Sequence, residues 1–341
     1  MSKEYSKLLD GLLDGRSLAE SQAYKLMYKL ADGELPPALA GALLAGLRAK
    51  GETADEIRGF ATAMRELAVH PDIPEGAPTV DTVGTGGDGS GSLNLSTGTG
   101  LLAAACGSRV VKHGNRSVSS RSGSADMLEC LGMPLPLHEK EAVSCLEATS
   151  FTFLFAPAYH PAMKSVVPIR GALAVRTVFN VLGPLTNPAA PPFQLIGAYS
   201  KDTAKLMAET LSGMPLERAF LVHGEPGWDE ATPAGDFVLY DVRPGSVMET
   251  MRSPGDYGVS VCQPEDLGGG DAEHNARELV RVFTGEDKGA HRDALLMGTS
   301  LVLEVQGVAA NAAEGVEQAA AAIDDGRAET FLSSLRAHFE D

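Results

Sequence analysis

The chain has 341 residues, of which 44% are hydrophobic, and this suffices for two domains or for one large α/β domain with an appendage. Its formal net charge of −17 argues against general binding to nucleic acid or to anionic membranes, because both need a basic surface. The N-terminus has no basic segment followed by a long apolar run, and no later run approaches the ~18 apolar residues of a membrane span. We therefore expect a soluble, cytoplasmic protein. The four cysteines form no Cys-x-x-Cys pair, which favours reduced thiols over a zinc site or a disulfide framework.

Three short amphipathic helices are predicted in the first seventy residues. A capping box of Ser17 and Glu20 precedes the first helix. The second begins at Pro36–Pro37, and a capping box of Thr53 and Glu56 starts the third. Helices this short bury little on their own, so their apolar faces need the rest of the chain or a second subunit as a partner.

A Pro-rich hinge at 70–78 leads into a region where strands and helices alternate. The predicted strands are the apolar runs at 79–83, 109–112, 152–155, 193–199 and 218–224. Continuous apolar strands separated by helical patterns are typical of a parallel sheet covered on both faces. Residues 236–251 predict an antiparallel excursion, and helices return after Asp271. The predicted fold class is α/β, with a large domain whose mostly parallel central sheet is flanked by helices and a small all-helical N-terminal domain.

A glycine-rich loop, DTVGTGGDG at residues 81–89, follows the first predicted strand and matches the pattern G-x-G-x-x-G. A dinucleotide site would need a helix directly after the glycines and an acidic residue at the end of the next strand. Instead, a Gly- and Ser-rich stretch follows, and the next strand ends in Lys112 and His113. No Gly-Lys-Ser/Thr sequence closes the loop either. A phosphate-type ligand or a structural turn remains for this loop.

The surroundings of the loop favour the ligand. Residues 94–97 place hydroxyls and backbone N–H groups at a predicted helix N-terminus, which attracts anions. One strand later, residues 112–124 form a basic, hydroxyl-rich loop, which is unusual in so acidic a chain. Two such loops at the carboxyl ends of neighbouring parallel strands face one crevice. This arrangement suits a ligand with phosphate at both ends.

An acidic pair, Asp229 and Glu230, lies in the loop after another apolar strand. A polyphosphate calls for a divalent cation that is held by few carboxylates and by phosphate oxygens. On a loop both side chains can converge on one ion. In a chain with 45 acidic residues, a solvated acidic pair is the alternative interpretation.

Six motifs together resemble the anthranilate phosphoribosyltransferases, a family of tryptophan biosynthesis. They occur in the order GTGGD, N-x-S-T, KHGNRSVSS.SGSAD, FAPAYHPAMK, RT.FN.LGPLTNP and VHG…DE. Each motif is weak alone, and the ordered set is highly specific. The resemblance implies that anthranilate and phosphoribosyl pyrophosphate are the substrates and that Mg²⁺ is the cofactor. It also implies electrostatic catalysis, with Lys112 and Asn115 as candidate stabilisers of the transition state and no certain general base.

The resemblance also implies the residues of each subsite. The positions that match the family's phosphoribosyl pyrophosphate site are Gly84, Gly87, Asp88, Ser92, Asn94, Leu95, Ser96, Thr97, Lys112, His113, Gly114, Asn115, Arg116, Ser117, Val118, Ser119, Ser120 and Ser124. Those that match its anthranilate site are Gly84, Asn115, His160 and Arg170, with Gly183 and Pro184 in the hinge beside them. Those that match its magnesium ligands are Ser96, Asp229 and Glu230.

The family's fold implies a helical domain at 1–72, joined by a returning segment at about 168–190, and a large α/β domain at 73–341. The helical domains of the family usually pair into a homodimer. This chain departs from the family's usual sequence at Ala174, where glycine is common, at Trp228, where leucine is common, and at Met297–Thr299. We expect the last departure to concern helix packing.

Three alternatives remain. The nearest is a phosphoribosyltransferase that acts on another aromatic amine. A pyrimidine nucleoside phosphorylase shares this type of fold and a glycine-rich phosphate loop, but the ordered motifs and Asp229-Glu230 fit it less well. A silent relative that binds nucleic acid would need a basic cleft, which the net charge disfavours.

Overall fold

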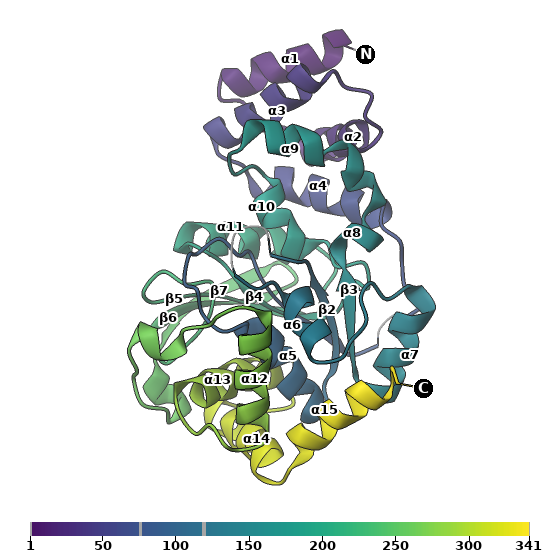
Figure 1. Cartoon of the computed structure of the whole chain (residues 1–341). Coiled ribbons are helices and arrows are strands. Elements are labelled where there is room, and N and C mark those ends of the chain that lie inside the picture. The colour runs from purple at the N-terminus through teal and green to yellow at the C-terminus, as the bar shows by residue number, and fades with distance from the viewer. Residues whose placement is uncertain (1, 75–76, 118–120, 341) are drawn as a thin grey trace.

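The structure, a computed structural model, describes residues 2–74, 77–117 and 121–340 (Figure 1). Four helices form the N-terminal part, one more than the sequence predicts. They are α1 (Ser2–Leu13), α2 (Glu20–Ala31), α3 (Pro37–Lys50) and α4 (Ala54–Glu66). Among the described residues, no helix is both long and apolar enough to cross a lipid bilayer.

The helix caps confirm one predicted capping box and correct another. Thr53 and Glu56 form the expected box at the start of α4, where the Thr53 N–H donates to Glu56 Oε2 at 2.8 Å. The box predicted at Ser17 is wrong, since α2 begins at Glu20 and its N-cap, Ala19, donates its N–H to Gln22 Oε1 at 2.9 Å. Glu56 explains the later start. Its buried carboxylate accepts the Leu18 N–H at 2.7 Å, which holds the chain extended before α2.

A returning segment brings residues near 170 back to the helical part. It contains α8 (Ala156–Tyr159), η1 (Pro161–Ser165), α9 (Val167–Leu173), α10 (Phe179–Leu182) and η2 (Gly183–Leu185). Helix α9 packs across α3, as Figure 1 shows, so closely that a Cβ at Gly41 would lie 3.6 Å from Leu173. The assignment of 168–190 to the helical domain stays a prediction. The domain boundary at 72/73 stays a prediction.

The large part is built on a seven-stranded sheet in the order β3-β2-β1-β4-β5-β6-β7. The strands are β1 (Thr79–Gly84), β2 (Arg109–Gly114), β3 (Phe151–Phe155), β4 (Phe193–Gly197), β5 (Arg218–Gly224), β6 (Phe237–Arg243) and β7 (Ser246–Arg252). Strands β1 to β5 are parallel to one another, and β6 and β7 pair antiparallel. The mostly parallel sheet and its antiparallel excursion are therefore confirmed.

Helices cover both faces of this sheet. The remaining helices are α5 (Leu95–Ala105), α6 (Ser124–Cys130), α7 (Glu139–Thr149), α11 (Lys201–Ser212), η3 (Pro254–Tyr257), η4 (Pro264–Leu267), α12 (Ala272–Phe283), α13 (Ala290–Val305), α14 (Ala312–Asp324) and α15 (Arg327–Ala337). Successive residues of β5 point to opposite faces, so Phe220 joins the core under α5 and α13 while Leu221 joins a second core with α11. Because both faces are buried, the strands are apolar along their length and do not alternate between apolar and polar residues.

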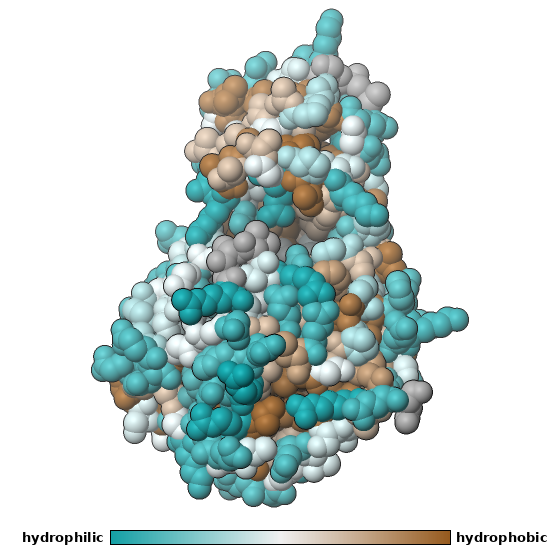
Figure 2. All heavy atoms as spheres, in the orientation of Figure 1, coloured by the Kyte–Doolittle hydropathy of each residue, from teal (hydrophilic) through white to brown (hydrophobic). Residues whose placement is uncertain are grey.

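The second core continues from the sheet into the helical part. It contains Leu221 and Tyr240 from the sheet, Met207 from α11, and Phe60 and Leu44 from the N-terminal helices. Figure 2 shows hydrophobic patches interspersed with hydrophilic residues on the surfaces of both the upper, helical part and the α/β part. One apolar core thus spans the two parts of the chain.

The structure accounts for two of the departures. Gly298 lies where α13 crosses α5, and any Cβ there would collide with Thr99. The expectation that Met297–Thr299 concern helix packing is therefore confirmed. Trp228 is only 7% exposed and belongs to the first core.

Ala174 yields the first testable prediction, because it ends α9 in the left-handed conformation, with φ 50° and ψ 29°. Glycine adopts this conformation without steric cost. We expect Ala174→Gly to raise the free energy of unfolding by about 1 kcal/mol in urea titrations. Ala172→Gly, on the exposed side of the same helix, is the matched control and should lower it by about 0.5–1 kcal/mol. A loss of stability in both variants would contradict the prediction.

Candidate active site

The loop 228–230 lies directly over the carboxyl ends of three parallel strands. Each of these strands, β1, β4 and β5, ends in glycine. A Cβ at Gly84 would lie 2.5 Å from Asp229 Oδ2, and a Cβ at Gly197 or Gly224 would collide with the backbone of Asp229 or Glu230. Only glycine permits this approach. The strand-end glycines therefore place the acidic pair on the sheet edge.

The acidic pair connects the glycine loop to the N-terminus of α5. Asp229 Oδ2 accepts the Gly86 N–H at 2.6 Å, and Glu230 Oε1 accepts the Ser96 N–H at 3.0 Å. The Asp229 N–H donates to Asp88 Oδ2 at 3.3 Å. Asp229 is 8% exposed, so the interpretation as a solvated pair is wrong. Both predicted phosphate elements and the acidic pair meet at one edge of the sheet.

The acidic cluster contains more carboxylates than cations. Burial raises the pKa of Asp229, with a further contribution from Asp88, and it raises the pKa of Glu230, with a further contribution from Asp229. Lys112 lies beneath them, 2% exposed, and donates its Nζ protons to Ser96 Oγ at 3.3 Å and to the Thr82 carbonyl. Burial lowers the pKa of Lys112, and the neighbouring carboxylates act in the opposite direction. One buried lysine does not neutralise three acidic side chains.

The oxygen-rich cluster fits a divalent cation. Ser96, Asp229 and Glu230 offer hydroxyl and carboxylate oxygens, which are the ligands that Mg²⁺ prefers when phosphates complete its shell. Within the described part of the chain, the three acidic or histidine side chains whose ligand atoms lie within 4.8 Å of one another are Glu278, Asp287 and His291, between α12 and α13. The predicted set holds two carboxylates and one hydroxyl, so a divalent cation there would need further ligands, which phosphate oxygens can supply.

The basic loop after β2 differs in part from its prediction. The Arg116 guanidinium is paired with Asp126 at 3.0 Å and with Glu129 through Nη2 at 2.5 Å, so its charge is used within the protein. The predicted role of Arg116 in phosphate binding is therefore not supported by its side-chain contacts. Ser117 and Ser124 also bond within this loop, through Asp126 Oδ2 and the Asn115 carbonyl. Predicted residues Val118, Ser119 and Ser120 lie outside the described residues.

Other predicted donor-site residues surround the N-terminus of α5. Asn94 is the N-cap, held by Ser122 Oγ at 3.0 Å and by Asn275 Nδ2 at 2.8 Å. Leu95 and Thr97 are buried, so only their backbone groups can reach a ligand. The side chain of Ser92 is held in the glycine loop, 3.2 Å from Ser90 Oγ. Gly87, with φ 75°, lies at the exposed apex of that loop.

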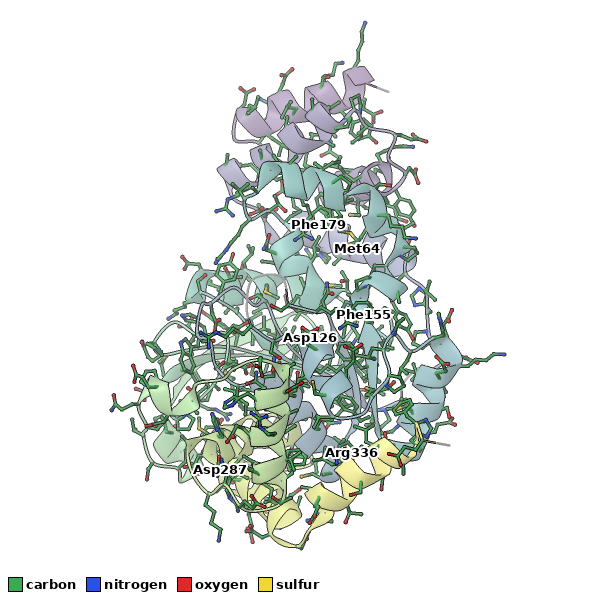
Figure 3. All side chains as sticks on the ribbon, viewed as in Figure 1. Met64, Asp126, Phe155, Phe179, Asp287 and Arg336 are labelled. Atoms are coloured by element: carbon green, nitrogen blue, oxygen red, sulfur yellow. The ribbon has the colours of Figure 1, made fainter. Side chains whose placement is uncertain are left out.

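A cavity of about 440 Å³ opens between the helical part and the sheet edge. All four residues predicted for the acceptor line it, together with both hinge residues: Gly84, Asn115, His160, Arg170, Gly183 and Pro184. Figure 3 shows Met64 on α4 and Phe179 on α10 at this junction. The Arg170 guanidinium carbon lies 5.4 Å from the centre of the Phe179 ring. The cavity thus combines apolar walls with two cationic side chains, Arg170 and Lys164, which suits an aromatic carboxylate.

Two buried histidines, His113 and His160, line this cavity with their rings edge to face and ring centres 5.1 Å apart. His113 Nδ1 lies 3.2 Å from the Gly183 carbonyl, while the Nε2 atoms of His113 and His160 have no hydrogen-bond partner among the described residues. Burial lowers the pKa of His113 to about 3 and that of His160 to about 4. Both rings are therefore uncharged at neutral pH.

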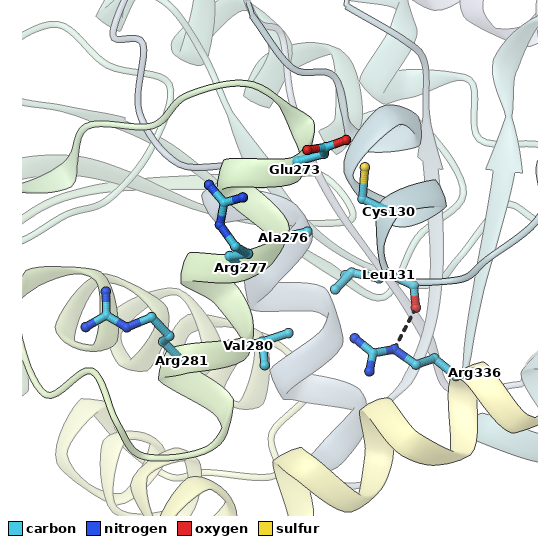
Figure 4. Close-up of a pocket in the computed structure, with 8 residues that line it drawn as sticks. All are labelled: Cys130, Leu131, Glu273, Ala276, Arg277, Val280, Arg281 and Arg336. Atoms are coloured by element: carbon cyan, nitrogen blue, oxygen red, sulfur yellow. Dashed lines mark hydrogen bonds between the residues drawn. The ribbon is translucent and has the colours of Figure 1, made fainter.

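A second hollow, of about 530 Å³, lies apart from these residues between α6, α12 and α15 (Figure 4). In it Arg336 Nε donates to the Leu131 carbonyl at 3.0 Å. Its lining residues are Cys130, Leu131, Glu273, Ala276, Arg277, Val280, Arg281 and Arg336, none of which is a predicted site residue.

Comparison with known proteins decides the family. The helical bundle domain of the glycosyl transferase family matches residues 6–68, and the a/b domain of that family matches residues 76–329. An anthranilate phosphoribosyltransferase of Rubrobacter xylanophilus is 43% identical over 314 residues, which are 92% of this chain and 91% of the relative. The chain belongs to the anthranilate phosphoribosyltransferase family.

Solved structures of anthranilate phosphoribosyltransferases agree over the whole chain. The Thermus thermophilus enzyme has a TM-score of 0.91 and 40% identity, covering 98% of this chain and 99% of its own. The Saccharomyces cerevisiae enzyme in complex with PRPP and Mg has a TM-score of 0.90 and 26% identity, covering 100% and 99%. The same yeast enzyme in complex with 4-fluoroanthranilate has a TM-score of 0.88 and 25% identity, with the same coverage. The α/β fold with a helical N-terminal domain is therefore confirmed.

Sequence reasoning missed several residues of the site. Asn275 holds Asn94 from a helix 181 positions away, and nothing in its local sequence marks it. Asn187 donates to the buried Asp81 at 2.8 Å and to the Val111 carbonyl at 2.8 Å. These bonds join the segment after Gly183 and Pro184 to β1 and β2. Asn180 lines the acceptor cavity. Asn180 and Asn187 both lie within the RT.FN.LGPLTNP motif, which could have identified them.

The neutral histidine pair generates a prediction about pH. Because the pKa of each ring is lower in the folded state than its ordinary value of about 6.5, the unfolded chain binds more protons below that pH. Stability should therefore be lost as pH falls through 6.5, by about 2 kcal/mol per histidine between pH 7 and pH 5.

Urea unfolding at the two pH values checks this dependence. The double variant His113→Gln, His160→Gln should lose most of the difference, whereas the exposed His138→Gln should keep it. An unchanged difference in the double variant would show that other groups cause the acid sensitivity.

Proposed function

We propose that this chain transfers the phosphoribosyl group of phosphoribosyl pyrophosphate to the amine of anthranilate and releases pyrophosphate, with Mg²⁺ as cofactor. The observation that carries the proposal is the meeting of two sites at Gly84. The glycine loop and acidic pair lie on one side of this residue, and the cavity with Arg170 lies on the other. Such a junction places a donor carbon next to an acceptor amine, which lowers the entropic cost of the reaction.

The donor side would bind and orient the polyphosphate. Backbone N–H groups at a glycine loop and at a helix N-terminus attract anions, and here those of Gly86 and Ser96 already donate to the carboxylates of Asp229 and Glu230. Ser96, Asp229 and Glu230 would hold Mg²⁺, and the bound ion would neutralise charge that develops on pyrophosphate. Lys112 supports this edge from beneath through Ser96. Because Lys112 is buried, we assign it to electrostatic support of the acidic cluster and not to direct contact with phosphate.

The acceptor side would hold anthranilate by its carboxylate and its ring. Arg170 has the fork geometry that binds a carboxylate through two parallel hydrogen bonds. Apolar groups of Met64 and Phe179 can contact the aromatic ring. His113 and His160 are both uncharged, so Arg170, together with Lys164 in the same cavity lining, would supply the positive charge for the acceptor carboxylate. An aromatic amine becomes acidic once alkylated, so water or a weak acceptor can take its proton.

A homodimer through the helical domain stays a prediction, as does the cytoplasmic location. Leu13, Val167 and Val175 support the dimer because they are large apolar residues exposed in the helical part and the segment that returns to it, at 68%, 57% and 56%. Sedimentation velocity would test it, since a dimer has about twice the 35.6 kDa mass of one chain.

Turnover tests the proposed function directly. Purified protein with Mg²⁺ and phosphoribosyl pyrophosphate should consume anthranilate, measured as a loss of its fluorescence. Chelation of the metal should abolish the loss. Asp229→Asn should lower kcat by about 100-fold or more, because the carboxylate that would hold the cation is gone. Absence of turnover at saturating substrates, or turnover with another aromatic amine instead, would contradict the proposal.

Arg170 offers a separate test of the acceptor site. Arg170→Ala should raise the anthranilate KM by about 10- to 100-fold, the cost of a lost charge-assisted hydrogen bond, and should leave the donor KM nearly unchanged. The exposed Arg277→Ala, outside both sites, is the control and should match the wild type. If Arg170→Ala weakened only the donor, the acceptor assignment would be wrong.

A further inference from the structure

Arg176 spans the gap between the returning segment and the glycine loop. It lies in the coil between α9 and α10, after the left-handed turn at Ala174. Its Nη2 donates to the Gly87 carbonyl at 2.8 Å, and its guanidinium carbon lies 4.2 Å from the centre of the Tyr199 ring. Both partners are uncharged. The cation is thus used to hold a backbone carbonyl and not to balance an acid.

The glycine loop needs such a contact. Gly86 and Gly87 have φ values of 66° and 75°, and glycine loses more conformational freedom on ordering than any other residue. The base of the loop is fixed on β4, where Thr85 N donates to the Gly197 carbonyl at 3.0 Å and the Tyr199 N–H donates to Thr85 Oγ1 at 3.1 Å. The apex is exposed to solvent.

Two side chains fix the apex, and one peptide unit separates the two backbone groups that they hold. Asp229 Oδ2 accepts the Gly86 N–H at 2.6 Å, and Arg176 donates to the Gly87 carbonyl. The Asp229 carboxylate is itself a proposed cation ligand, so its hydrogen bond to the loop depends on how it binds the cation. Arg176 is held independently, because its guanidinium stacks on Tyr199 at the end of β4.

We propose that Arg176 is a positioning residue that keeps the glycine loop in its donor-binding shape. The inference rests on the proposed function of that loop. Arg176 acts through the Gly87 carbonyl, which turns the neighbouring N–H groups towards the donor, and through Tyr199, which fixes the direction of the guanidinium. It belongs to the segment that also carries Arg170, so the donor loop is anchored on the wall of the acceptor cavity.

Calorimetric titration of Mg²⁺ and phosphoribosyl pyrophosphate into the purified protein tests this role without turnover. Arg176→Ala should weaken donor binding about tenfold, the effect of losing one charge-assisted hydrogen bond at an exposed site. Arg176→Lys should recover only part of this loss, because lysine keeps an N–H group that can donate a hydrogen bond but lacks the planar stacking on Tyr199. Arg243→Ala, an exposed arginine on the distant β6–β7 hairpin, should bind as the wild type does.

Steady-state kinetics and stability complete the test. Arg176→Ala should raise the donor KM about tenfold and keep the anthranilate KM within about twofold of the wild type, with the same urea midpoint as Arg243→Ala. Tyr199→Leu should raise the donor KM in the same direction. Unchanged donor affinity in Arg176→Ala, or a rise in the anthranilate KM alone, would overturn the inference. A wild type that binds the donor but does not turn over would instead refute the proposed function.

Discussion

Steric exclusion at three strand ends determines the layout of the site. The loop with Asp229 and Glu230 lies so close to β1, β4 and β5 that a Cβ at Gly84, Gly197 or Gly224 would collide with it. Because of this approach, two carboxylates lie against the carboxyl edge of a parallel sheet, where loops and helix N-termini already direct N–H groups outward. The acidic pair then bonds to both phosphate elements, at Gly86 and at Ser96.

The buried charges follow from the same constraint. Carboxylates held against a sheet edge lose water, which raises the pKa of each and makes a cation favourable beside them. Lys112 supplies part of the compensation from below, at the cost of burying its own ammonium. The rest of the positive charge has to come with the ligand.

Sequence patterns predicted the mostly parallel sheet and most of the helices, because apolar periodicity and capping chemistry are local properties. They failed where the outcome depends on a partner that is distant in the chain. Ser17 is the better intrinsic cap, but Glu56 holds Leu18 and moves the start of α2. Arg116 looked like a phosphate ligand, yet Asp126 and Glu129 pair with it on the next helix. Asn275 and Arg176 gained their roles only when the chain folded. The ordered motifs, which combine many weak signals, identified the family that the comparisons confirmed.

The apolar core that runs from the N-terminal helices into the sheet has a consequence for how the chain can be divided. Phe60 and Leu44 share this core with Leu221 and Tyr240, so the helical part and one face of the sheet bury each other's apolar surface. Arg58 and Arg65 reinforce the joint by donating to the Thr210 and Leu185 carbonyls. Cleavage of the chain at the 70–78 hinge would leave two fragments, each with an apolar face exposed to water, that are stable only together. The compact helical bundle visible in the fold is thus a separate shape without being a separate folding unit.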